Sequence, residues 1–95
     1  MASPMEFKVF ETLQFGEILL VIYDWMQFPD SQLIRNLYAY DLEGERLWIA
    51  EQRRPGDFFT GFVGDGKLLR VATWDCFCCT LDPGTGKTAH SFFTK

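Results

Sequence analysis

Two stretches of the chain decide the fold: residues 37–48 read LYAYDLEGERLW, and residues 77–90 read FCCTLDPGTGKTAH. In each, a short apolar run ends at an aspartate, a turn with glycine follows, and a second short run begins. Trp48 and His90 each lie four residues past the turn glycine. The pattern predicts two related β-hairpins, because glycine takes the positive φ of tight turns and aspartate accepts hydrogen bonds from turn amides.

The rest of the chain extends each hairpin into a four-stranded unit. Short apolar runs alternate with Gly, Pro, Asp and Asn, and helical periodicity is nearly absent. Eight strands are predicted, at about Phe7–Leu13, Glu17–Tyr23, Asn36–Asp41, Arg46–Ala50, Phe58–Val63, Leu68–Trp74, Phe77–Leu81 and Thr88–Phe93.

We therefore expect a single all-β domain over residues 1–95, built from two pseudo-repeated four-stranded antiparallel units. The units span about 6–51 and 57–95, with the segment Glu51–Asp57 between them. The run Ile18–Tyr23 is apolar on both faces, so it must be covered on both sides. An eight-stranded sandwich or barrel is the alternative arrangement.

The hairpins resemble the blade repeats of quinoprotein-like (PQQ-type) β-propellers. In that pattern an Ala and an Asp close one strand, a Thr-Gly-Lys turn follows, and a Trp lies in the next strand. The first unit has a shorter turn that lacks the Thr, and the second has Thr80 for the Ala and His90 for the Trp. The matching residues are Ala39, Asp41, Gly44 and Trp48 in the first unit, and Asp82, Thr85, Gly86 and Lys87 in the second.

This resemblance covers about residues 17–51 and 67–95 and implies two propeller-blade-like units. The chain also resembles small stand-alone bacterial proteins of one or two such units, some associated with toxin neutralisation. The resemblance implies no quinone site, because many blades and a metal build that site in the enzymes. Closed propellers have about 4–8 blades, so two units with open edges are expected to associate with a second copy, as a homodimer or larger assembly.

The composition excludes several classes of protein. The chain has 13 acidic and 9 basic residues, a net charge of −4, and one basic pair, Arg53-Arg54, so no nucleic-acid partner is expected. The longest apolar run has six residues, against about 20 for a membrane helix, and Met1–Glu6 lacks the features of a secretory signal. The odd set of three cysteines is no disulfide framework, so a cytoplasmic location is predicted.

Two motifs that carry chemistry elsewhere are interpreted here as structural. The segment 83–88, PGTGKT, is similar to the end of a phosphate-binding loop, but Leu81 stands where that motif has its first glycine. A strand rather than a helix is predicted after it, so we expect a hairpin turn. The three cysteines, Cys76, Cys78 and Cys79, lack the second ligand pair of a zinc site and are expected to pack in a strand.

The titratable residues are also interpreted as structural. His90 is expected to be a packed ring, because it takes the place that Trp48 has in the first unit. Asp24, Asp41, Asp75 and Asp82 recur at strand ends, where turn capping is expected rather than an acid–base pair. No catalytic, cofactor or metal site is predicted.

The candidate binding site is the long loop after the second strand, with Asp24, Trp25, Met26 and Phe28. The chain has 16 aromatic residues, 10 of them Phe, and Trp25 and Phe28 are not explained by the repeat. Exposed, this loop is a partner or ligand site; folded back, it caps an open end of the sheets. We expect a non-catalytic protein-interaction module, in one version an immunity-type protein that neutralises a basic toxin. A small-ligand or carbohydrate binder using Trp25, Trp48 or Trp74 is the alternative.

Overall fold

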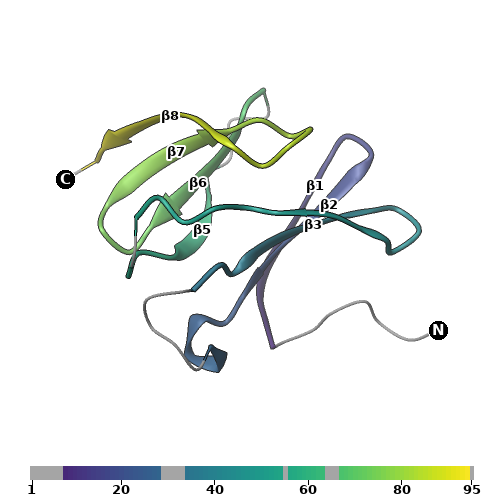
Figure 1. Cartoon of the computed structure of the whole chain (residues 1–95). Coiled ribbons are helices and arrows are strands. Elements are labelled where there is room, and N and C mark those ends of the chain that lie inside the picture. The colour runs from purple at the N-terminus through teal and green to yellow at the C-terminus, as the bar shows by residue number, and fades with distance from the viewer. Residues whose placement is uncertain (1–7, 29–33, 55, 64–66, 95) are drawn as a thin grey trace.

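The protein folds into two four-stranded antiparallel sheets in a computed structural model that describes residues 8–28, 34–54, 56–63 and 67–94 (Figure 1). The first sheet has the order β1 (Val9–Phe15), β2 (Ile18–Tyr23), β3 (Leu37–Asp41), β4 (Arg46–Ile49). The second has the order β5 (Phe59–Val63), β6 (Leu69–Thr73), β7 (Phe77–Leu81), β8 (Thr88–Phe93). A short 3-10 turn, η1 (Trp25–Gln27), follows β2.

The predicted fold class is confirmed. The chain is all-β and has two antiparallel units, and the strand ends differ from the prediction by two residues or fewer. Phe7, the predicted start of the first strand, lies outside the described residues. Within the described ranges each strand pairs with its neighbours in sequence, so both sheets are simple meanders that are not closed into a barrel.

The main core lies between the two sheets. Leu20 and Ile22 of β2 point into it from the first sheet, and Leu69 and Val71 of β6 meet them from the second. Burying each such side chain stabilises the fold by about 1.5–3 kcal/mol. The two units therefore share one core. Its other buried members are Leu37, Ala39, Ala50, Phe59, Cys79 and Leu81.

The opposite face of the first sheet carries a second buried cluster. Val21 and Tyr23 of β2 meet Tyr38 and Tyr40 of β3 there. The hydroxyls of Tyr23 and Tyr40 are hydrogen-bonded to each other, and the rings of Tyr23 and Tyr38 meet edge to face at 4.9 Å. This confirms that β2 is covered on both sides, as its uninterrupted apolar run predicts.

The two hairpin turns form as predicted. The Oδ1 atom of Asp41 accepts hydrogen bonds of 2.9 Å from the amides of Glu43 and Glu45. In the second unit the Oδ1 atom of Asp82 accepts one of 2.9 Å from the amide of Gly84, and β8 follows as a strand. The PGTGKT segment is therefore a hairpin turn.

The second turn also contacts a side chain of the first unit, that of Trp48. The indole of Trp48 in β4 donates a 2.9 Å hydrogen bond to the carbonyl of Pro83. Its ring lies so close to Gly86 that a Cβ atom there would be 2.2 Å from the ring, and Gly86 has a φ of +78°. Trp48 thus joins the two units at a position where only glycine fits without strain.

The expectation of a packed ring at His90 is wrong. His90 is exposed on β8, where its nearest ring contact is Phe92 at 5.9 Å. The reason is topological: the Trp48 side chain extends toward the turn of the second unit, whereas β8 is an edge strand whose described residues are all exposed.

Candidate functional site

The long loop begins with a capped 3-10 turn. The Oδ1 atom of Asp24 accepts a 2.9 Å hydrogen bond from the amide of Met26, and the amide of Phe28 donates to the carbonyl of Trp25 at 3.2 Å. These bonds hold Trp25 against two aromatic neighbours. Its ring lies 4.9 Å from that of Phe10 and 4.9 Å from that of Phe58, nearly parallel to the latter at 24°.

A fourth ring extends this contact. Trp74, directly after β6, stacks on Phe58 at 5.6 Å and 16°, and its amide donates a 2.9 Å hydrogen bond to the carbonyl of Phe58. Phe10, Trp25, Phe58 and Trp74 therefore form a continuous aromatic chain. Phe10 lies in β1, Trp25 in η1, Phe58 directly before β5 and Trp74 directly after β6, so the aromatic chain crosses from one unit to the other.

The two ends of the aromatic chain are open to solvent. Phe10 is 50% exposed and Trp74 is 63% exposed, whereas Trp25 is half-buried and Phe58 is buried. Met26, next to Trp25, is 81% exposed. Exposed large apolar side chains mark candidate binding surfaces, and Phe10, Met26 and Trp74 are the candidates here.

The four predicted site residues differ in their placement: some are folded back against the sheets, and one is exposed as a binding residue would be. Asp24 caps η1, Trp25 is folded into the aromatic chain, and Met26 points to solvent. Phe28 lies against the tyrosine cluster of the first sheet, so it belongs to the packing there. The sequence analysis missed Phe10 and Phe58, because neither has a local signal that separates it from a core phenylalanine.

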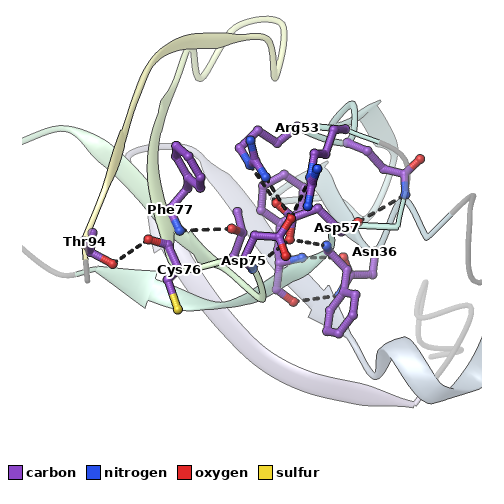
Figure 2. A network of polar contacts seen from close by, with 12 residues as sticks. Asn36, Arg53, Asp57, Asp75, Cys76, Phe77 and Thr94 are labelled. Atoms are coloured by element: carbon purple, nitrogen blue, oxygen red, sulfur yellow. Dashed lines mark hydrogen bonds and ion pairs between the residues drawn. The ribbon is translucent and has the colours of Figure 1, made fainter.

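The buried carboxylate of Asp57 lies in a network of polar contacts with Arg53 and Asp75 (Figure 2). The Asp57 side chain is fully buried, and its Oδ1 atom accepts hydrogen bonds from the amides of Phe58 (2.9 Å) and Asp75 (3.1 Å). Its Oδ2 atom is paired with Nε of Arg53 at 2.8 Å. A buried carboxylate paired and hydrogen-bonded in this way positions the backbone on both sides of the aromatic chain.

Asp75 completes the ion-pair network. Its Oδ2 atom pairs with Arg53 at 2.9 Å and with Arg54 at 2.7 Å. The hydrogen bond from Arg54 holds the pKa of Asp75 below its usual value, although desolvation opposes that shift. The Arg53 guanidinium also lies 3.9 Å from the centroid of the Phe77 ring. Asp75 is therefore an ion-pair partner of the segment Glu51–Asp57 between the units, named here the linker, which corrects the expectation that it caps a turn.

Asn36 joins the two sheets beside this network (Figure 2). Its Nδ2 atom donates 2.9 Å hydrogen bonds to the carbonyls of Tyr23 and Phe59, and its Oδ1 atom accepts one of 3.0 Å from the amide of Phe59. The buried amide side chain thus takes the place of a neighbouring strand for Phe59. Asn36, Arg53, Arg54, Asp57 and Asp75, named here the polar junction, hold the aromatic chain on a rigid base.

A depression of about 420 Å³ is lined by Arg35, Arg53 and Arg54 together with Glu51 and Gln52. Each of the three arginines already makes contacts within the chain, since Arg53 and Arg54 bind Asp75 and Arg35 donates to the carbonyls of Ile49 and Ala50. The depression is therefore part of the polar junction, and we do not assign it a separate ligand.

Two of the three cysteines pack in a strand as expected, and the third, Cys76, lies in the turn before it. Cys78 and Cys79 are buried in β7, Cys76 is half-buried in the preceding turn, and all three are free thiols. Burial raises the pKa of the Cys79 thiol to about 11, so it stays protonated and unreactive at neutral pH. Across the described residues, no three His, Cys, Asp or Glu side chains are grouped to hold a metal ion.

No helix in the described parts of the chain is long and apolar enough to cross a membrane. The fold and the surface define a class: a two-sheet β-domain whose junction displays a chain of aromatic rings. Residues 4–93 match the family described as "Domain of unknown function (DUF7957)", and the chain belongs to that family. Searches of curated proteins and of solved structures gave no significant match.

Proposed function

We propose that the protein is a non-catalytic protein-interaction module that binds its partner through the aromatic chain and Met26. The observation that carries this proposal is the pair of open ends, Phe10 and Trp74, on rings that are already packed against one another. Tryptophan and other large aromatic residues supply most of the binding energy in many interfaces. Rings that are fixed before binding lose little conformational entropy on association.

The charge of the molecule favours a basic partner. The net charge of −4 gives a field that attracts a cationic protein and speeds its encounter. One specific form of the proposal is an immunity-type role, in which the protein blocks a basic toxin in a bacterial cytoplasm. The three free thiols support the reducing compartment, and the paired meanders support kinship with propeller-blade repeats. A toxin gene beside the gene for this chain would support this form.

The proposal is tested by comparing the wild-type protein with Trp74→Ala in affinity capture from cells of the source organism. We expect a discrete protein partner with the wild type and a loss of about tenfold or more in affinity with the variant, because truncating a hot-spot tryptophan costs about 2 kcal/mol or more. Isothermal titration with the identified partner measures that loss.

Leu42→Ala is the matched control. Leu42 is also an exposed apolar residue, but it lies in the turn after β3, at the end of the first sheet where Ile18 pairs with Asp41. This end is opposite to the one from which η1 begins. A partner that binds both variants as it binds the wild type would refute the proposal.

Carbohydrate binding is a second candidate, favoured by the exposed ring of Trp74. Sugar stacking needs a free ring face, and Trp25 has aromatic neighbours in Phe10 and Phe58, while Trp48 is docked on Gly86. A sugar site on this surface would therefore depend on Trp74 and not on Met26. Glycan binding that is lost in Trp74→Ala and kept in Met26→Ser would favour this candidate over a protein partner.

A further inference from the structure

The four edge strands of the two sheets are protected unequally. An edge strand presents unpaired N–H and C=O groups that pair readily with another chain, and proteins block them with charged side chains, bulges or covering groups. On β5, Asn36 binds both backbone groups of Phe59, and the carboxylate of Glu11 accepts from the amide of Phe62 at 3.4 Å. That edge is covered from within the molecule.

The edges of the first sheet are protected as well. On β4 the carbonyl of Ile49 accepts a 3.1 Å hydrogen bond from Arg35. On β1 the register shifts between Val9 and Glu11, which places a bulge and a charged side chain in the strand. Both features oppose pairing with a further strand.

In its regular part, the edge of β8 has no charged side chain and no bulge. The strand reads Thr-Ala-His-Ser-Phe-Phe, contains no Asp, Glu, Lys, Arg or Pro, and is exposed at all six residues. Phe92 is 44% exposed and Phe93 is 57% exposed. A register shift lies near Thr88, and the pairing with β7 is regular from His90 to Phe93. Figure 1 shows β8 as the outer strand of the second sheet.

The hydrogen bonds of β8 show which backbone groups are open. The amide of Thr94 donates to the carbonyl of Cys76 at 2.8 Å, one residue outside the Phe93–Phe77 pair. In an antiparallel ladder this makes Phe93–Phe77 a pair that exchanges no hydrogen bonds. The N–H and C=O groups of Phe93, and by alternation those of Ser91, therefore point away from β7.

We propose that β8 is a self-association edge, and that a second copy of this chain pairs antiparallel with it about a two-fold axis at Phe92. In this register Ser91 and Phe93 of the two copies exchange four backbone hydrogen bonds. Phe92 of one copy faces Phe92 of the other in a close, non-hydrogen-bonded pair, which favours aromatic contact. No like charges of Asp, Glu, Lys or Arg meet across this interface, since β8 contains none of these residues. The two second sheets then form one continuous eight-stranded sheet.

Sedimentation velocity over a series of protein concentrations tests this interface. We expect the mass to rise with concentration from 11.0 kDa toward twice that value. Ser91→Pro is the sharpest variant, because it removes an N–H that points to the open edge and leaves the bonds to β7 in place. It is expected to stay at 11.0 kDa, whereas Ser91→Ala, which keeps the N–H, is expected to associate as the wild type does.

Phe92→Lys is the second variant, in case proline unfolds the strand. It places two ammonium groups across the axis and is expected to weaken association by at least about tenfold, and less at high salt. A wild type that remains at 11.0 kDa at every concentration would overturn the proposal. So would a folded Ser91→Pro or Phe92→Lys that associates as strongly as the wild type. Trp74→Ala keeps this association if the β8 edge and the aromatic chain are separate surfaces.

Discussion

At the scale of single residues, Gly86 carries two constraints at once. Its φ of +78° disfavours any side chain, and an added Cβ atom would lie 2.2 Å from the Trp48 ring. The left-handed conformation costs a non-glycine residue about 1–2 kcal/mol. Overpacking commonly costs about 1–3 kcal/mol more.

We therefore expect Gly86→Ala to lower the free energy of unfolding by about 2–5 kcal/mol, measured by urea denaturation. Gly16→Ala is the matched control, because Gly16 has a φ of +63° and no atom within 4 Å of an added Cβ. Gly16→Ala should lower the free energy of unfolding only by the cost of the left-handed conformation, about 1–2 kcal/mol. In a Trp48→Ala background the cost of Gly86→Ala should fall to that of Gly16→Ala, and equal costs in both backgrounds would contradict the account.

At the scale of elements, the strands and turns could be predicted because their signals are local. Asp41 and Asp82 mark the hairpins, and the apolar run Ile18–Tyr23 marks a strand covered on both faces. The aromatic chain could not be predicted, because its rings come from four segments that meet only when the two sheets pack. The same is true of Asn36, whose partner Phe59 is 23 residues away in sequence.

The linker element gives a prediction about pH. Because Arg54 lowers the pKa of Asp75 in the folded state, this carboxylate stabilises the fold fully above its unfolded pKa of about 3.9, and the contribution is lost as pH falls through the folded value. Asp75→Asn should therefore be less stable than the wild type at pH 7, and the difference should shrink on acidification. Urea midpoints of both proteins at several pH values test this; a difference that stays constant with pH would show that the ion pair is not its cause.

At the scale of the whole molecule, the two units are neither independent nor closed. They share one core, and the polar junction ties the linker to both sheets. Among the described residues, the open ends of the aromatic chain and the edge of β8 are surfaces that packing within one chain leaves unused. Neither can be identified from composition, since 16 aromatic residues fit a core as well as an interface.

The most direct test of the central claim, that the aromatic chain is a protein-binding surface, is photocrosslinking in living cells. A photoreactive amino acid at Met26, which is 81% exposed beside Trp25, is compared with one at Leu42, which is 59% exposed in the turn after β3. We predict one discrete heterologous protein adduct at position 26 that disappears with Trp74→Ala, and no such adduct at position 42. The absence of a protein adduct at position 26, or an equal one at position 42, would contradict the claim.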